Sequence, residues 1–105
     1  MIKIEFLEDF ECKGHWFDWE VPGAHNNVTI EFKKGEISAA LWITGEPTDA
    51  DCFIGLPTQQ LTKELQDSDN MSPWYEFEID GSKFRKIGKM TFEEGMEYVK
   101  NFRLI

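Results

Sequence analysis

The chain has 105 residues, with twenty Asp and Glu against eleven Lys and Arg, so its formal net charge is −9. This length indicates one domain, residues 1–105, and nine Phe, four Trp and two Tyr can fill its core, which argues against disorder. The acidic balance argues against a nucleic acid partner, because phosphates would be repelled. The chain has no apolar run near the roughly 20 residues of a membrane span and no signal-peptide pattern, so we expect no membrane partner and a cytoplasmic protein.

Two strands are expected in the first quarter of the chain. Residues 1–8 alternate between apolar and charged side chains, which predicts a half-buried strand. A polar connection that ends in glycine follows at 8–14, and residues 15–21 alternate again. Pro22-Gly23 is expected to end this second strand, and residues 24–27 then form a loop.

A β-hairpin is expected over residues 28–43, with a two-residue turn at Lys34-Gly35. In this register Phe32 faces Ile37, and every apolar residue of one arm meets an apolar residue of the other. The face expected in the core carries Val28, Ile30, Phe32, Ile37, Ala39, Leu41 and Ile43, and the outward face carries Thr29, Glu31, Ser38, Ala40 and Trp42. The first 43 residues therefore predict four strands in an antiparallel meander.

The middle of the chain predicts a loop and then a short helix. Residues 44–55 are rich in Gly, Pro and Asp, as expected of a loop. Leu56-Pro57-Thr58 has the pattern of a helix start, and Leu61 and Leu65 would share one side of that helix. Asp67 and Asp69 would oppose the helix dipole at its end, so either the helix ends before them or they serve a purpose other than stability.

The last third of the chain predicts a second hairpin and a final helix. Asp80-Gly81 is a strong turn signal within 74–87, and it places Phe77 opposite Phe84, Glu78 opposite Lys83 and Glu76 opposite Arg85. Thr91 and Glu94 form a capping box for a helix over 91–102, whose apolar side includes Gly95 and thus favours close packing on a sheet. The predicted fold class is α+β: one domain with a mostly antiparallel sheet of about six strands, in the order ββββ-α-ββ-α, and two helices on one face.

Four residues are candidates for sites of chemistry: Cys12, His15, His25 and Cys52. Cys12-x-x-His15 has the spacing of a metal-ligand pair, but no second close pair accompanies it, so we predict no metal site. No nucleophile motif surrounds Cys12 or Cys52, and we expect two free thiols, no cofactor and no enzyme. The alternative is a small-molecule-binding or enzymatic domain that uses His15, His25 and Cys12, and it requires a deep pocket lined by them.

Tryptophans among acidic residues indicate a protein-binding surface. Trp16, Trp42 and Trp74 fall on faces opposite the apolar stripes, unless helices or loops cover them. Aromatic side chains supply the buried centre of such a surface, and carboxylates steer a basic partner toward it. The residues expected to bind the partner are Trp16, Asp18, Glu20, Trp42, Glu46, Asp49, Asp51, Asp67, Asp69 and Trp74.

The expected function is therefore that of an acidic protein-binding module. Its most concrete form is an immunity protein or inhibitor, a monomer or weak dimer, that plugs the active site of a basic partner such as a bacterial toxin nuclease. A DNA-mimicking inhibitor is a related alternative, and it requires carboxylates at phosphate-like spacings on one face. A structural or phage-like assembly domain is a further alternative, and it requires a large symmetric apolar interface.

Overall fold

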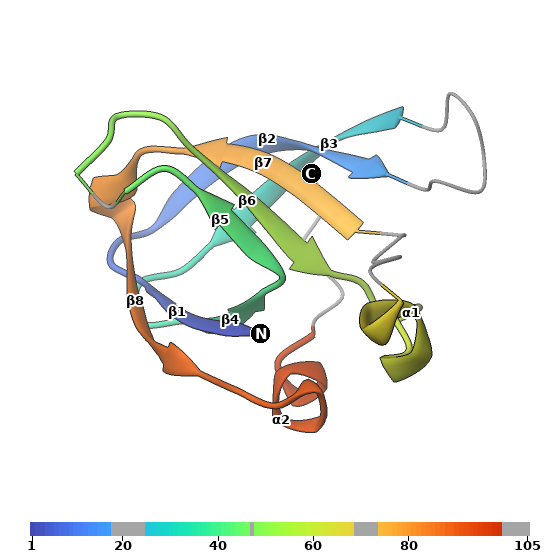
Figure 1. Cartoon of the computed structure of the whole chain (residues 1–105). Helices are drawn as coiled ribbons and strands as arrows, with labels where there is room; N and C mark the ends of the chain where they lie inside the picture. Colours follow the sequence, from blue (N-terminus) through green and yellow to red (C-terminus); the bar gives the residue numbers. More distant parts are fainter. Residues whose placement is uncertain (18–24, 47, 69–73, 100–105) are drawn as a thin grey trace.

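A computed structural model describes residues 1–17, 25–46, 48–68 and 74–99 and shows a single α+β domain (Figure 1). The predicted fold class is confirmed, although these residues form eight strands in two antiparallel sheets rather than about six strands in one. The elements are β1 (Ile2–Phe6), β2 (Phe10–Phe17), β3 (His25–Phe32), β4 (Ile37–Ala40), β5 (Trp42–Thr44), β6 (Cys52–Pro57), α1 (Lys63–Asp67), β7 (Trp74–Ile79), a 3₁₀ turn η1 (Gly81–Lys83), β8 (Phe84–Lys89) and α2 (Phe92–Glu97).

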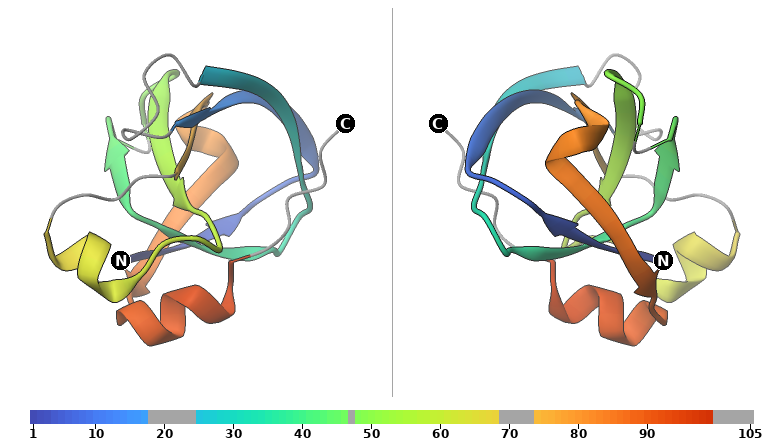
Figure 2. Two further views of the ribbon diagram at one scale, coloured as in Figure 1. Left: turned by 90° about the vertical axis from the view of Figure 1, so that its right-hand side faces the viewer. Right: turned by 90° about the vertical axis from the view of Figure 1, so that its left-hand side faces the viewer.

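The two sheets curve around a shared interior (Figure 2). One sheet has three strands in the order β4-β1-β8, and the other has five in the order β3-β2-β7-β6-β5. β4 and β5 follow one another directly and belong to different sheets. Between them, the Leu41 backbone N–H donates a hydrogen bond of 2.8 Å to the Gly55 carbonyl, so the chain bends from one sheet into the other without a loop.

The core lies between the sheets and includes a cluster of Phe rings around Phe32 of β3. The Phe32 ring stacks on Phe6 with a centroid distance of 4.1 Å, and it lies 5.1 Å from Phe10 and 5.2 Å from Phe77. Phe6 comes from the three-stranded sheet and Phe77 from the five-stranded sheet, so this ring cluster joins the two layers. The core cluster comprises Ile4, Phe6, Ile30, Phe32, Ala40, Cys52, Ile54, Leu56, Phe77, Ile79 and Phe84.

The turn of the hairpin predicted over 28–43 is present, but the two strands that flank it do not pair with each other. The turn at Lys34-Gly35 is closed by a 3.0 Å hydrogen bond from the Glu36 N–H to the Lys33 carbonyl. Its arms then separate, because β3 pairs with β2 and β4 pairs with β1, so the four-strand meander is also wrong. Because the arms are not paired, the inward side of β4 is not set by β3.

The face of β4 is consequently the reverse of the predicted one. Ser38 and Ala40, which we expected to face outward, pair with Ile4 and Ile2 on the interior side, and both are buried. Ala39 faces the opposite side, where α2 covers it. In β3 the predicted inward residues Ile30 and Phe32 are buried, as expected.

The predicted hairpin over 74–87 is divided in the same way. β7 pairs with β2 and β6, while β8 pairs with β1. The predicted partners Phe84 and Arg85 therefore lie in the other sheet, and Lys83 lies in η1. Asp80-Gly81 begins the 3₁₀ turn η1 rather than a two-residue turn, and the Asp80 carboxylate accepts a 2.9 Å hydrogen bond from the Ser82 N–H. That hydrogen bond lowers the pKa of Asp80.

Several boundaries also differ, because strand pairing overrides local composition. The strand predicted over 1–8 is β1, but the polar connection predicted at 8–14 gives way to β2 at Phe10. The loop predicted at 24–27 lies within β3 from His25 onward, and residues 18–21 of the second predicted strand lie outside the described residues. The loop predicted at 44–55 ends at Cys52, where β6 begins.

The middle helix begins later than predicted. Leu56 and Pro57 close β6, and Thr62 caps α1 by accepting a hydrogen bond from the Leu65 N–H. α1 reaches Asp67 instead of ending before it, and Lys63 lies 3.4 Å from the Asp67 carboxylate, one helical turn away. This i,i+4 pair offsets part of the unfavourable placement of an acid at the helix end.

The last helix has the predicted capping box, formed by Thr91 and Glu94. It ends at Glu97 rather than near residue 102. Its predicted close packing is confirmed at Gly95, because a Cβ there would overlap Met1 Sδ and lie 3.4 Å from the Ala39 Cβ. Glycine therefore lets α2 approach the outer side of the three-stranded sheet.

Candidate functional site

The outer face of the five-stranded sheet carries the aromatic residues nearest the acidic loop. Directly paired residues of an antiparallel sheet point to the same face. Ile54 and Phe77 are paired and buried, so the residues on either side of them in sequence face outward. Two outward rows result: Trp42, Gly55, Glu76 and His15 form one, and Thr44, Phe53 and Glu78 form the other.

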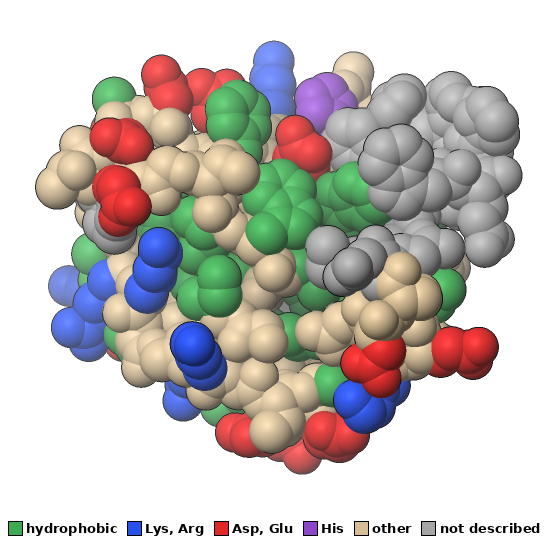
Figure 3. Space-filling view, in the orientation of Figure 1, with side chains coloured by type: hydrophobic (Ala, Val, Ile, Leu, Met, Phe, Trp, Pro, Cys, Tyr) green, Lys and Arg blue, Asp and Glu red, His purple; other side chains and the backbone are tan. Residues whose placement is uncertain are grey.

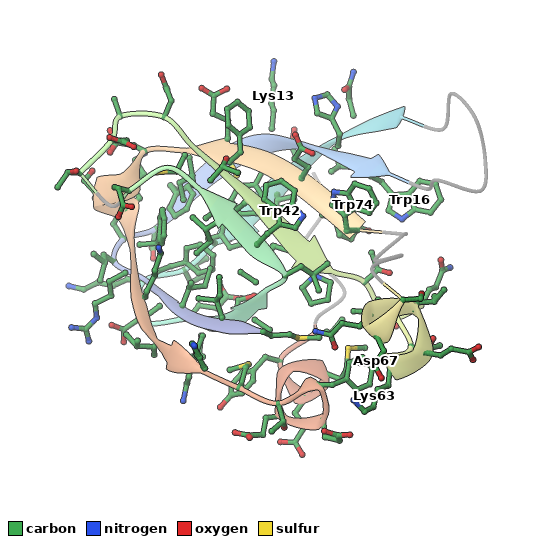
Figure 4. The ribbon with its side chains drawn as sticks, viewed as in Figure 1. Lys13, Trp16, Trp42, Lys63, Asp67 and Trp74 are labelled. Carbon is green, nitrogen blue, oxygen red and sulfur yellow. The ribbon has the colours of Figure 1, made fainter. Side chains whose placement is uncertain are left out.

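Trp42 lies flat over the β6 backbone at Gly55. A Cβ at Gly55 would overlap three atoms of the indole ring, and Gly55 is buried beneath it. The absence of a side chain on β6 therefore creates the seat for this ring, an arrangement in which an aromatic residue covers a glycine on the neighbouring strand. Figure 4 shows Trp42 extending from β5 over this sheet.

Phe53 is the most exposed large apolar side chain of the described residues, at 42 %. It faces Thr44 across the β5–β6 pair, and Trp42 is its diagonal neighbour on the same face. We call Trp42, Phe53, Glu76 and Glu78 the aromatic face. Figure 3 shows hydrophobic side chains over β5, β6 and β7, with acidic side chains above them and to their upper left and Lys or Arg side chains to their lower left.

The loop between β5 and β6 supplies three more carboxylates, those of Glu46, Asp49 and Asp51, and all three residues are exposed. Internal hydrogen bonds hold this loop. The Asp49 carboxylate accepts a 2.8 Å bond from the Glu46 N–H, and Cys52 Sγ donates to the Glu46 carbonyl at 3.1 Å. The Asp49 carbonyl also accepts a 2.9 Å bond from the Gly81 N–H, so the loop is fixed to η1 beside the aromatic face.

The loop and the aromatic face meet at Asp51 and Glu78. These two carboxyl groups share a hydrogen bond, which raises the pKa of Glu78, and burial and the Asp51 charge add to the rise. Two carboxylates held this close repel one another. The fold thus holds negative charge close together next to Phe53, which pairs with Glu78 across the β6–β7 ladder.

Glu78→Gln is expected to raise the melting temperature at neutral pH. The pKa of Glu78 is raised in the folded state, so the fold favours its protonated form, and stability is lost as pH rises through that pKa. The advantage of the variant should therefore disappear as the pH falls below the pKa. Melting curves of both proteins between pH 3 and 8 would measure it, roughly the range over which carboxylates titrate. Glu93→Gln in the first turn of α2 is the control, because a carboxylate is favourable there, and the same pH-dependent gain in that variant would contradict the assignment to this pair.

The other residues predicted to bind a partner are dispersed. Trp74 lies on the same outer side of β7 as Glu76 but is only 8 % exposed. Trp16 is half-buried and pairs with Tyr75 on the interior side of the five-stranded sheet. Asp67 lies on α1 beside Lys63, away from Trp42 (Figure 4). Asp18, Glu20 and Asp69 lie outside the described residues. Of the ten predicted residues, the structure brings together Trp42, Glu46, Asp49 and Asp51 on the β5–β6 hairpin.

Sequence reasoning missed Phe53, Glu76 and Glu78 as parts of one surface. Phe53 was assigned to a loop, although Cys52, Ile54 and Leu56 alternate with Phe53 and Gly55 in the pattern of a half-buried strand. That alternation was the available signal. The sequence pattern predicts that the two glutamates pair with Arg85 and Lys83 across a hairpin, whereas these basic residues belong to β8 and η1.

Of the candidates for catalysis, Cys12 and His15 lie on opposite faces of β2, and the side chain of His25 lies outside the described part of the structure. Cys12 pairs with Ile30 and packs against the core, whereas His15 faces the outer side of β2. Burial raises the pKa of Cys12 to about 12, with Lys83 partly offsetting the rise, so its thiol stays protonated at neutral pH. A pocket of about 240 Å³ lies elsewhere, lined by Asp9, Phe10, Glu11, Glu31, Phe32 and Lys33. Within the described part of the chain, no group of three or more His, Cys, Asp or Glu side chains is placed to hold a metal ion.

Comparison with known proteins found no matching family, no matching curated protein and no matching solved structure. Within residues 1–17, 25–46, 48–68 and 74–99, no helix has the length and apolar character needed to cross a membrane.

Proposed function

We propose that this chain is an acidic protein-binding module that docks a basic protein on the aromatic face. The observation that carries the proposal is the exposure of Phe53, 42 %, beside the half-buried ring of Trp42 and among carboxylates. Aromatic side chains are over-represented among the residues that dominate binding energy at protein interfaces. Surrounding charges contribute association rate and choice of partner.

The charge on this surface defines the chemistry of the partner. Glu76 and Glu78 lie on the face, and Glu46, Asp49 and Asp51 lie on the adjoining loop. Lys13 and His15 of β2 are the basic side chains nearest in the sheet order. A partner with Lys or Arg side chains around an apolar depression would complement this arrangement, and the net charge of −9 would accelerate its approach.

The most specific form of the proposal is an inhibitor or immunity protein that occupies the phosphate-binding site of a basic toxin nuclease. Such a site binds phosphate with cationic side chains, for which the carboxylates would compete. The proposal places this encounter in the cytoplasm, because both cysteines are free thiols, as expected of a reducing compartment.

The test uses purified small basic nucleases as probes, with association and dissociation rates measured at several salt concentrations. We expect one of them to bind in a 1:1 complex, to lose activity, and to associate more slowly as salt rises. Phe53→Ala should weaken this binding by about tenfold or more, which corresponds to 1.4 kcal/mol, mainly through faster dissociation.

Two matched double variants distinguish the effect of charges on the aromatic face from the effect of net charge alone. Glu76→Gln with Glu78→Gln removes two charges from the aromatic face, and Glu93→Gln with Glu97→Gln removes two exposed charges from α2. We expect only the first pair to slow association markedly. Equal slowing by both pairs would contradict docking at this face, and failure of every nuclease to bind would contradict the nuclease form of the proposal.

A further inference from the structure

β8 is an edge strand of the three-stranded sheet, and it is unusually open to solvent. It follows β1 at the end of the order β4-β1-β8, and every residue after Phe84 is exposed. An edge strand presents backbone N–H and C=O groups that can pair with a strand from another molecule. A strand from another molecule could therefore extend the three-stranded sheet at β8, if the side chains of β8 permitted it.

The side chains of β8 oppose such growth. Phe84 pairs with Phe6 on the interior side, and both are buried. The next two interior positions are occupied by Lys86, opposite Ile4, and Lys89, opposite Ile2. A strand added at this edge would have to place its own interior side chains against two ammonium groups, which are costly to remove from water.

A β-bulge shortens the regular part of the same edge. The register shifts between Lys3 and Ile4, whose partners are Gly88 and Lys86, so Ile87 is an extra residue in β8. Gly88 has φ +148°, a conformation that favours glycine. Bulges and inward-pointing lysines are both means by which natural sheets protect their edges.

We propose that Lys86 and Lys89 close the β8 edge against pairing with a second copy of this chain. This inference is independent of the docking proposed for the aromatic face, which lies on the other sheet. Two β8 strands brought side by side would also place Arg85, Lys86 and Lys89 of both copies near one another. The repulsion between like charges and the cost of burying these ammonium groups would together disfavour a continuous sheet between two molecules.

The test replaces both lysines, Lys86→Val with Lys89→Val, and compares the variant with Lys34→Val and Lys63→Val. The control loses the same charge and gains the same side chains at exposed positions outside β8. Sedimentation over a wide concentration range should show the wild type and the control at the monomer mass and the β8 variant approaching twice that mass. Hydrogen exchange in the associated variant should show new protection of the β8 backbone amides.

Three results would overturn the inference. A folded β8 variant that stays monomeric would show that the lysines do not close the edge. Equal association of the control would assign the effect to charge or hydrophobicity in general. If the β8 variant fails to fold, hydrogen exchange of the wild type decides: β8 amides that become protected as concentration rises would show that the native edge is already paired between molecules.

Discussion

Phe32→Ala is expected to lower the free energy of unfolding by about 3–5 kcal/mol, the usual range for removing a buried Phe ring. Phe32 is 1 % exposed, and its ring contacts come from both sheets: Phe6 from one, and Phe10 and Phe77 from the other. The cavity would thus lie where the two layers meet and would be hard to close without moving one of them. Because domains are typically stable by only about 5–15 kcal/mol, the variant should be close to unfolding at 37 °C.

Urea denaturation followed by circular dichroism would measure this loss. Phe53→Ala removes the same ring from the exposed outer side of β6 and is the matched control. We expect the control to change the free energy of unfolding by much less than Phe32→Ala. Similar losses for both variants would contradict the role of Phe32 as a buried ring that joins the two sheets.

Gly55→Ala is expected to lower the free energy of unfolding by about 1–3 kcal/mol, as typical of an added group in a filled space. The new methyl group would overlap the Trp42 indole, so either the ring leaves its seat on β6 or the strands separate. In both cases the aromatic face changes shape, so Gly55→Ala should weaken binding of the proposed partner as well as lower the stability of the fold.

A double-mutant cycle isolates this effect. Gly55→Ala should cost much less in a Trp42→Ala background, because the ring that the methyl group would meet is gone. The quantity to compare is the difference in the free energy of unfolding caused by Gly55→Ala with and without Trp42. An identical cost in both backgrounds would show that the glycine is required for the β6 backbone itself and not for seating the ring.

Much of the core was predictable from alternation alone. Ile4, Phe6, Ile30, Phe32, Phe77 and Phe84 were all placed on apolar faces, and all are buried. The capping box at Thr91 and the close packing at Gly95 were also predictable, because both depend on residues only a few positions apart or on the cost of one glycine.

The partners of the strands were not predictable, and the two divided hairpins show why. Phe77 and Phe84 satisfy the same alternation whether they pair across a hairpin or meet across a core from opposite sheets. Alternation reports which side of a strand is buried, not which strand lies next to it. The same ambiguity limited the prediction of the candidate site, because Phe53, Glu76 and Glu78 come together only through the pairing of β6 with β7.

The order of strands in the three-stranded sheet has a consequence for synthesis of the chain. β1, β4 and β8 come from the beginning, the middle and the end of the sequence, and no continuous half of the chain contains all three. Domains dominated by such distant pairings typically fold in milliseconds to seconds, more slowly than helical ones. During translation the three-stranded sheet therefore cannot be completed until β8 emerges from the ribosome. Until then, the backbone N–H and C=O groups on one edge of β1 have no partner strand.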